Sequence, residues 1–423
     1  MSQPTTARTA RTGTERTLED VCREEVPHVL GALVRRYGDF GEAEDAVQEA
    51  LVAAVTQWPG DGVPLNPRAW LIRVASRRLV DQLRSSQART TREQAINQPT
   101  DADQTPAVEA ASANADDSLL VIFLCCHPAL TRASQVALTL RAVGGLTTAQ
   151  VAAAFLVPEA TMAQRISRAK TTLRSAGARF TAPTAEELPD RVAAVLDVLY
   201  LIFNEGYTAS GGRSLVDLSL TREAIRLTRQ LRRLLPAHDE VAGALALMLL
   251  TNARTATRTD DHGDLVPLAD QDRSRWDHDA IREGLAIVEQ VLPVGPVGPY
   301  QLQAAIAAVH ADAGTWEDTD WEQIAVLYGM LDDRAPSPTV TLNRAVAVGM
   351  TFGPEQGLAM LEPLEAMASI QSSHRLFAVR AHLLEMAGRP AEAALDFARA
   401  AQLTASIPEQ RYLNARREQA AQR

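Results

Sequence analysis

Hydrophobic positions recur with a helical period along most of this chain. From Val21 to about Arg92 the pattern is nearly continuous and breaks only at the Pro- and Gly-containing segment 58–64. It resumes over 118–178, and proline marks a further break near Pro183. Ala, Leu and Val dominate the 46% of hydrophobic residues, whereas aromatic residues make up only 4%. This composition favours packed helices over a sheet, so we predict an all-α protein.

The breaks in the pattern divide the chain into segments. A tail rich in Thr, Ala and Arg comes first, and an acidic stretch without a basic residue follows the first helical block. A second division beyond residue 185 falls at the segment Pro293–Pro299. The predicted segments are a flexible tail (1–20), a helical block (21–92), a flexible acidic linker (93–117), a compact helical unit (118–178), a helical extension (185–292) and a region of helical hairpins (297–415).

The hairpin region contains a repeat of small and large residues. One copy resembles a tetratricopeptide (TPR) hairpin and consists of Phe377, Ala381, Leu384, Gly388, Ala393, Phe397 and Ala400, followed by Pro408. A weaker copy is formed by Ala345, Val348, Gly357, Leu361 and Leu364, and Tyr328 with Leu331 suggests a third. Stacked helical pairs need about three units to bury a core. We therefore predict TPR-like hairpins, which usually bind a peptide or pack in cis.

Residues 146–174 predict two short amphipathic helices joined by a tight turn. Thr147 and Gln150 have capping-box spacing for the first helix, and Pro158 suits the first turn of the second. The second helix has an apolar stripe formed by Met162, Ile166, Ala169 and Leu173. Its opposite side is polar, as expected for a helix-turn-helix whose second helix enters a DNA groove.

Charge is unevenly distributed along the chain. The formal net charge is −10, yet between Arg132 and Arg179 Glu159 is the only acidic residue among several basic ones. A local basic patch neutralises phosphates even when the whole chain is acidic. The charge pattern therefore favours DNA binding by the helix-turn-helix.

Two helices of opposite charge are predicted in the first block. The helix from Glu42 to Trp58 presents an acidic ridge opposite its apolar stripe, formed by Glu42, Asp45, Gln48 and Glu49. The next helix, within 67–84, packs through Ile72, Ala75, Leu79 and Leu83 and exposes Trp70, Arg73, Arg77 and Arg84. Arginine beside an aromatic ring suits single-stranded DNA. In the alternative interpretation Trp70 is a core residue and the arginines only solvate the helix.

The motifs of these helices carry a family resemblance. EAEDAVQEALVAAVTQWP (42–59) and NPRAWLIRVASRRLVDQLR (66–84) resemble region 2 of an extracytoplasmic-function (ECF) sigma factor of bacterial RNA polymerase, and the helix-turn-helix resembles region 4. FLCCHPAL (123–130), FLVPEATMAQR (155–165) and LYLIFNEGY (199–207) resemble the subgroup with a long helical C-terminal extension. The resemblance implies that the first block is sigma region 2 and the compact unit is region 4.

The resemblance also implies partners and residue roles. The β′ clamp helices and the β flap of core RNA polymerase are the expected protein partners, and the residues placed against the clamp helices are Asp45, Gln48 and Glu49. The minus-ten element, where a base is flipped out, is expected to contact Trp70, Arg73, Arg77, Arg78 and Arg84. The minus-thirty-five element is expected to contact Glu159, Thr161, Gln164, Arg165, Arg168 and Lys170.

No catalytic, metal or cofactor site is predicted. Cys125-Cys126-His127 lacks a second ligand pair at zinc spacing, so buried structural cysteines are expected. Asn204 and Glu205 can cap a helix or form a small polar site, and the structural role is favoured. Single histidines elsewhere, expected to be packing or surface residues, are His310, His374 and His382. The sequence shows neither a signal peptide nor a run long enough to cross a membrane, so a cytoplasmic protein is expected.

Together these features predict a sigma factor without enzymatic activity. It would bind core RNA polymerase, recognise the minus-ten and minus-thirty-five promoter elements and help to melt the DNA. The extension is expected to regulate the sigma core by docking on it in cis or on polymerase. One alternative is a helix-turn-helix transcriptional regulator with a TPR-like scaffold that acts without core polymerase. Another is an enzyme housed in 185–423, for which no catalytic motif is visible.

Overall fold

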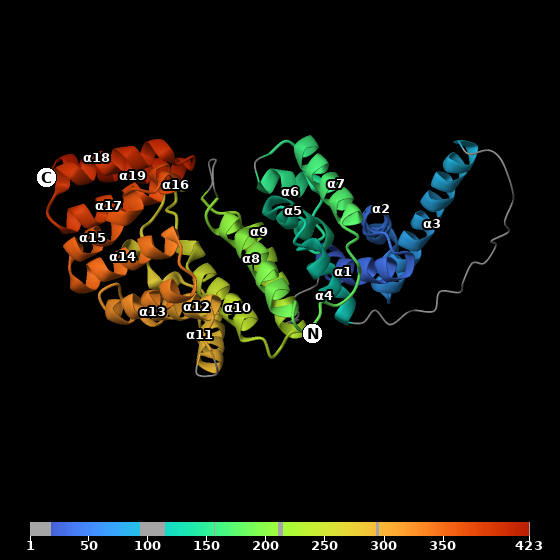
Figure 1. Cartoon of the computed structure of the whole chain (residues 1–423), viewed down its shortest axis with the longest axis horizontal. Coiled ribbons are helices and arrows are strands. Elements are labelled where there is room, and N and C mark those ends of the chain that lie inside the picture. Colours follow the sequence, from blue (N-terminus) through green and yellow to red (C-terminus); the bar gives the residue numbers. More distant parts are fainter. Residues whose placement is uncertain (1–17, 94–114, 156, 210–214, 293–295, 423) are drawn as a thin grey trace, which may run out of the picture. The chain divides into compact units, whose positions relative to one another are not determined.

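The computed structural model describes residues 18–93, 115–155, 157–209, 215–292 and 296–422. Within these ranges every regular element is a helix, and one isolated β-bridge joins Thr259 and Leu265 (Figure 1). The all-α prediction is confirmed. The predicted tail and nearly all of the predicted acidic linker lie outside the described residues. No helix among the described residues is long and apolar enough to span a membrane.

The described chain forms two compact units. The first consists of residues up to 129 together with 138–147 and 167–182, and the second consists of 130–137, 148–166 and 183–423. The helices wholly within the first unit are α1 (Leu18–Tyr37), α2 (Phe40–Asp61), α3 (Pro67–Glu93) and α4 (Ala115–Cys125). Helix α1 packs against α2, α3 and α4, and α2 also packs against α3. Fully buried side chains in this bundle include Leu30, Leu33, Leu71 and Leu79.

The helix-turn-helix predicted within residues 146–174 corresponds to α6 (Thr148–Ala154) and α7 (Glu159–Ser175), and α5 (Arg132–Ala142) precedes it. The predicted apolar stripe of α7 is confirmed, because Met162, Ile166, Ala169 and Leu173 are all buried. Pro158 precedes α7, and its carbonyl oxygen accepts the N–H groups of Thr161 and Met162. It therefore stands just before the first turn that the sequence predicted for it, where a missing N–H is equally harmless.

The second unit continues as a long array of helices. These are α8 (Leu188–Tyr207), α9 (Leu218–Leu234), α10 (Asp239–Asn252), α11 (His278–Val291), α12 (Pro299–Asp312), α13 (Trp321–Arg334), α14 (Pro338–Phe352), α15 (Pro354–Glu365), α16 (Ala368–Gln371), α17 (His374–Met386), α18 (Pro390–Leu403) and α19 (Ile407–Ala421). Short 3₁₀ turns lie at Thr255–Thr257, Leu268–Asp270 and Arg273–Arg275. Neighbouring helices of the array pack in sequence order, for example α12 on α13 and α13 on α14.

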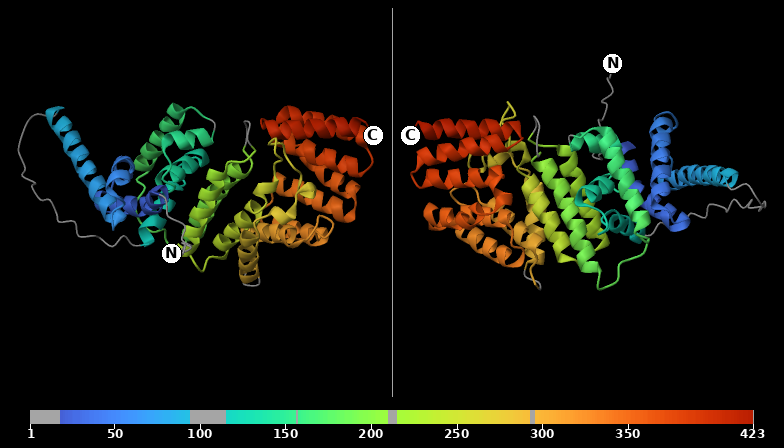
Figure 2. Two further views of the ribbon diagram at one scale, coloured as in Figure 1. Left: turned by 180° about the vertical axis from the view of Figure 1, so that it is seen from behind. Right: turned by 45° about the horizontal axis from the view of Figure 1, so that its top comes forward.

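The repeat residues form the packing surfaces of hairpins. Helices α17, α18 and α19 lie side by side (Figures 1 and 2), and Ala381, Phe397 and Ala400 belong to one buried cluster between them. Gly388, in the turn between α17 and α18, has a φ of +71°, which favours glycine. Helices α14 and α15 form a second hairpin, where Gly357 allows the close approach of a backbone carbonyl.

Candidate functional site

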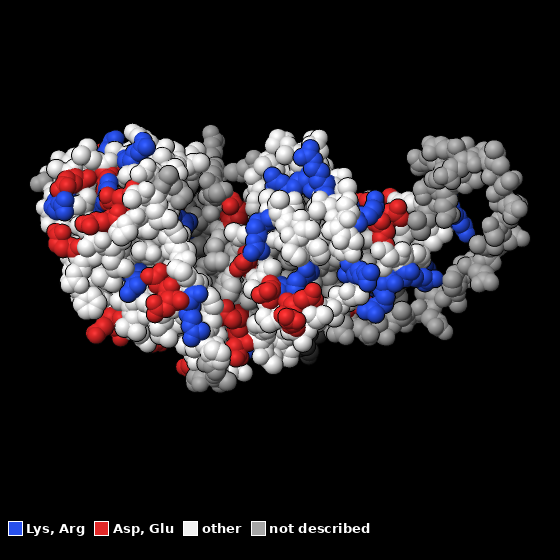
Figure 3. Space-filling model, in the orientation of Figure 1, with Lys and Arg blue, Asp and Glu red and all other residues white. Residues whose placement is uncertain are grey.

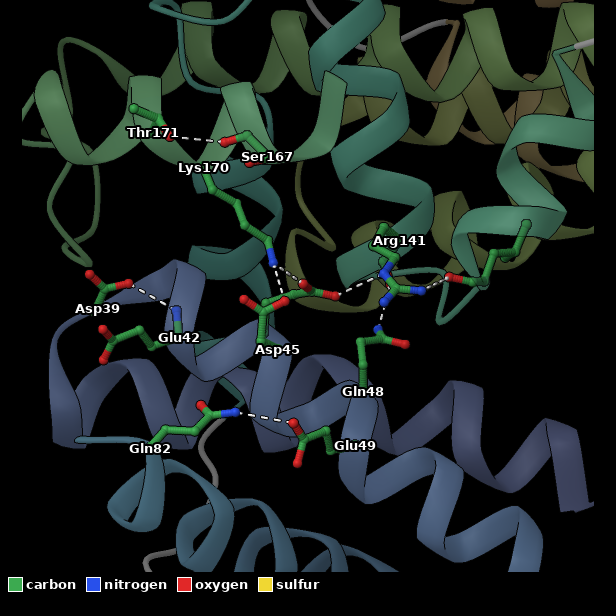
Figure 4. Close-up of polar contacts among 12 residues, drawn as sticks. Asp39, Glu42, Asp45, Gln48, Glu49, Gln82, Arg141, Ser167, Lys170 and Thr171 are labelled. Carbon is green, nitrogen blue, oxygen red and sulfur yellow. Dashed lines mark hydrogen bonds and ion pairs between the residues drawn. The ribbon is translucent and has the colours of Figure 1, made fainter. Parts of the chain in front are cut away.

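Helix α2 presents the residues predicted to bind a basic partner. Asp39 caps the helix by accepting a hydrogen bond from the Glu42 backbone N–H at 2.9 Å. The predicted inner positions, such as Val47 and Trp58, are buried, so the helix has the expected orientation. On the other side the Asp45 side chain is 60% exposed, and Gln48 and Glu49 follow along the helix (Figure 4).

A buried carboxylate, Glu44, lies at the centre of this acidic surface. Its side chain is only 1% exposed and pairs with Arg141 at 3.1 Å and with Lys170 at 2.5 Å. The Lys170 ammonium also lies 2.7 Å from the Asp45 carboxylate. Figure 4 shows Lys170 reaching down to Asp45. Lys170 comes from α7 and Arg141 from α5, so the acidic surface of α2 holds one basic side chain of the helix-turn-helix and one of the preceding helix.

The remaining acidic-surface residues have further partners. The Gln48 side-chain amide donates to the backbone carbonyl of Arg141 at 3.4 Å. Glu49 instead pairs within the helical bundle: Gln82 on α3 donates to it at 3.1 Å, and Arg78 lies 3.6 Å away. Thus Asp45 contacts α7, Gln48 contacts α5 and Glu49 contacts α3.

A third ion pair, besides the two formed by Lys170, joins α7 to the N-terminus of α2. Arg174 donates to the Asp39 carboxylate at 2.9 Å. Partial burial disfavours ionisation of Asp39, but the hydrogen bonds from Arg174 and from the Glu42 backbone outweigh it, so the pKa of Asp39 is lowered. The carboxylate therefore stays ionised and paired at neutral pH.

Helices α1 and α4 also pack against each other within the first unit. A Cβ atom placed on Gly31 would lie 2.7 Å from the Asp117 Cβ, so only glycine allows this approach. The His28 Nδ1 atom and the buried Ser118 hydroxyl are 2.8 Å apart, and Arg35 pairs with Asp117. Burial and the nearby Arg68 lower the pKa of His28.

Helix α3 carries the predicted minus-ten arginines on an exposed side. Arg73, Arg77 and Arg84 are exposed, and Arg78 is exposed but paired with Glu49. Trp70 is half-buried and packs edge-on against the buried Trp58, with ring centroids 5.3 Å apart.

The packing stripe of α3 differs by one position from the prediction. Leu71 is buried where the sequence suggested Ile72, which is half-buried, whereas Ala75 and Leu79 are buried as expected. The i, i+4, i+8 spacing of Leu71, Ala75 and Leu79 follows one helix face, and the continuous apolar run around Trp70 hid its start.

The predicted minus-thirty-five residues of α7 fall into two groups. Most of them face solvent, and Figure 3 shows basic side chains over this helix. The exposed residues are Glu159, Thr161, Gln164 and Arg168, whereas Arg165 is half-buried. Lys170 is different, because only 13% of its side chain is exposed and its ammonium is paired with two carboxylates.

Glu44 and Arg141 are not among the residues that the sequence pattern predicts for this site. Glu44 stands three residues before Val47 in the series 44, 47, 51, 54 and 58, which is the apolar face of α2. A charged residue on that face is a sequence feature that predicts a buried ion pair. Nothing in the sequence identifies Arg141 as its partner, since 97 residues separate the two.

The cysteine pair is buried, as expected. Cys125 and Cys126 are 0% and 1% exposed, and burial, together with neighbouring Cys126 and Glu44, raises the pKa of the Cys125 thiol. Among the residues that the structure describes, no group of three His, Cys, Asp or Glu side chains is placed to hold a metal ion.

Comparison with known proteins assigns families to three parts of the chain. Residues 21–90 match Sigma-70 region 2, and residues 120–173 match Sigma-70 region 4. Residues 191–292 match a family of unknown function, DUF6596. A protein of Rhizobium meliloti (strain 1021), described as uncharacterized, is 44% identical over 391 residues, which cover 92% of each chain. No solved structure matches the chain.

Proposed function

We propose that this chain, which belongs to the sigma-70 family as an ECF-like sigma factor with a C-terminal extension, binds core RNA polymerase through the acidic surface of α2. Sigma-70 regions 2 and 4 make it a factor for promoter recognition. The proposal adds which surfaces contact polymerase and DNA, and how contact with polymerase is controlled.

One observation carries the proposal: the acidic surface of α2 already holds basic side chains from other helices. Lys170 forms ion pairs with Glu44 and Asp45, and Arg141 forms an ion pair with Glu44. The side chain of Gln48 donates to the backbone carbonyl of Arg141. A surface that binds basic groups on helices has the charge complementarity that a basic clamp helix of polymerase needs. This supports Asp45, Gln48 and Glu49 as the contact with the β′ clamp helices.

The same observation implies a closed state. A side chain such as Asp45 cannot pair with Lys170 and with a polymerase residue at the same time without sharing its charge. We therefore propose that regions 2 and 4 separate before or during binding to polymerase. Polymerase, including its β flap, would then hold the two regions apart at the spacing of the two promoter elements.

The proposed DNA contacts use side chains that are exposed or half-buried. In region 2, Trp70, Arg73, Arg77, Arg78 and Arg84 are proposed to contact the minus-ten element and to support melting. In region 4, the first half of α7 is proposed to enter the major groove through Glu159, Thr161, Gln164, Arg165 and Arg168. Lys170 would reach a phosphate only after its carboxylate partners have left.

The extension is proposed to regulate the sigma core. Support comes from Arg132, at the start of α5, which donates to Asp197 on α8 at 2.5 Å and to the Ala194 carbonyl at 3.2 Å. This ion pair joins a helix of region 4 to the extension within the second unit. The extension can therefore influence the helix that carries Arg141.

The test is a titration of purified core polymerase with the full chain, followed by run-off transcription on a library of promoter fragments. The double variant Asp45→Lys, Glu49→Lys is expected to bind core at least about tenfold more weakly. Glu322→Lys, a matched charge reversal at an exposed position of α13, is expected to bind like the wild type. Failure of the folded wild-type chain to bind core or to start transcription on any fragment would overturn the proposal.

The DNA surface is tested separately in the holoenzyme. Arg168→Ala is expected to weaken binding to the upstream element by about 1–3 kcal/mol, because it removes a base or phosphate contact. Arg282→Ala, on the exposed side of α11, serves as the control. Sequence-specific DNA binding by the chain alone, with no effect of core polymerase, would instead favour a regulator that acts without polymerase.

A further inference from the structure

A large cavity lies within the C-terminal extension. Its volume is about 1330 Å³, which exceeds the roughly 300–1,000 Å³ typical of pockets for drug-sized ligands. Helices α8, α10, α12, α13, α14 and α17 all contribute to its wall. Asn204 and Glu205, for which the sequence favoured a structural role, lie on this wall, as do His310 and His374. These four residues are far apart in the sequence or were assigned no common role, yet they line the same cavity.

The carboxylates on the wall have partners within the protein. Asp197 accepts hydrogen bonds from Arg132 and, at 3.1 Å, from the Tyr300 hydroxyl. Glu240 accepts the backbone N–H of Tyr300 at 3.1 Å. Glu409 accepts a threonine hydroxyl at 2.5 Å and lies 3.5 Å from a histidine. These carboxylates are therefore held by hydrogen bonds within the protein, and Asp197 is also ion-paired with Arg132.

The positive charges on the wall are not compensated in the same way. Arg254 and Arg375 line the cavity, and within the described part of the chain neither is ion-paired with a carboxylate. Arg254 donates instead to the neutral hydroxyl of Tyr207 at 2.9 Å. The cavity wall thus carries two guanidinium groups that form no ion pair within the described residues, with Arg254 half-buried and Arg375 exposed, and both can neutralise a negatively charged occupant.

A third polar group on the wall, His310, has unmet hydrogen-bonding capacity. Burial, together with the charges of Arg254 and Arg273, lowers the pKa of His310 to about 4, so the imidazole is neutral. Its Nδ1 atom is buried and has no hydrogen-bond partner. A buried polar atom left unpaired costs free energy, which a bound polar group would recover.

The wall also provides aromatic surface. Tyr200 and Tyr300 meet edge to face with ring centroids 5.6 Å apart, and Tyr328 lines the cavity from α13. Burial raises the pKa of all three phenols, so they remain protonated hydrogen-bond donors. Aromatic rings that keep a polar end suit a ligand with both a flat apolar body and polar substituents.

We propose that this cavity is a receptor site for a small organic anion, whose planar apolar body lies among the tyrosines and whose acidic group is neutralised by Arg254 and Arg375. The site makes the extension a ligand-binding domain. The proposal concerns binding by the isolated chain, so it stands or fails independently of the contact with polymerase.

The test is a fluorescence titration of the full chain with 8-anilinonaphthalene-1-sulfonate, an aromatic anion. One probe molecule per chain is expected to bind, and Arg254→Met and Arg375→Met should each weaken binding about tenfold. Arg282→Met removes an exposed arginine outside the cavity and should bind like the wild type. The uncharged analogue N-phenyl-1-naphthylamine should bind wild type at least about tenfold more weakly. Equal affinities across these proteins, or equal binding of the uncharged analogue, would overturn the proposal.

Two further experiments sharpen this test. The first distinguishes loss of charge from misfolding, and the second distinguishes a small ligand from a peptide. Arg254→Lys keeps the charge and should keep most of the affinity; a loss equal to that of Arg254→Met would contradict a charge-based site. 2-Naphthoate should displace the probe, whereas a peptide with the acidic sequence of residues 100–117 should not. Displacement by the peptide at lower concentration than by naphthoate would replace the small anion with a peptide as occupant.

Discussion

Two carboxylates of α2 differ in burial, although both form ion pairs. Glu44 is 1% exposed and lies between Arg141 and Lys170, whereas Glu49 is 47% exposed and lies 3.6 Å from Arg78. Removing one partner of a buried ion pair costs about 3–5 kcal/mol, but an exposed pair contributes only about 0–1 kcal/mol. The buried carboxylate, not the exposed one, therefore holds α5 and α7 to the helical bundle.

The largest expected effect comes from neutralising the two carboxylates one at a time. Glu44→Gln leaves two largely buried cations without their shared carboxylate and should lower the free energy of unfolding of the first unit by about 3 kcal/mol. Glu49→Gln should lower it by less than about 1 kcal/mol. Urea denaturation followed by circular dichroism measures both. If both variants lost a similar free energy of unfolding, burial would not distinguish the contributions of Glu44 and Glu49.

A smaller effect is expected where the backbone of α1 closely approaches α4 at Gly31. Gly31→Ala places a Cβ atom 2.7 Å from the Asp117 Cβ and should cost about 1–3 kcal/mol. Gly60→Ala, at the end of α2, meets nothing within 4 Å and should be neutral or stabilising by up to about 1 kcal/mol. The difference in urea midpoint between the two variants measures the close approach. Equal midpoints would mean that α4 does not pack on Gly31 in solution.

The smallest effect is a pH dependence of the α1–α4 contact. Because the folded-state pKa of His28 lies below its ordinary value of 6.5, the unfolded chain binds more protons as the pH falls through that value. The stability that His28 contributes is therefore present above pH 6.5 and is lost on acidification. Urea midpoints between pH 7.5 and 5.5 should fall less for His28→Gln than for the wild type. An unchanged slope in the variant would assign the pH dependence to other groups.

The sequence predicted those features that depend on local periodicity. The buried stripe of α7, from Met162 to Leu173, follows from helical spacing alone, and so does the inner face of α2 at Val47 and Trp58. The matches to Sigma-70 regions 2 and 4 fall on the parts of the chain whose motifs resemble those regions. The roles assigned to individual DNA-contacting residues remain predictions.

Contacts between distant segments could not be predicted. Lys170 and Asp45 are separated by 125 positions, and nothing local distinguishes a lysine that binds phosphate from one that binds carboxylate. The cavity in the extension is lined by residues from α8 to α19. Their sequence positions alone do not show that His310 and Arg254 line the same cavity. The one-position shift of the α3 stripe to Leu71 arose because neighbouring apolar residues make its start ambiguous.

The most direct test of the closed state uses the fact that Lys170 is the only lysine of the chain. Its ammonium lies 2.7 Å from Asp45 and 2.5 Å from Glu44, within reach of zero-length cross-linking by a carbodiimide. Peptide mapping of the free, full-length protein should show an amide between Lys170 and one of these carboxylates, and core polymerase added first should abolish it. A Lys170 that forms no such cross-link in the free protein, yet reacts readily with an acetylating reagent, would contradict the closed state.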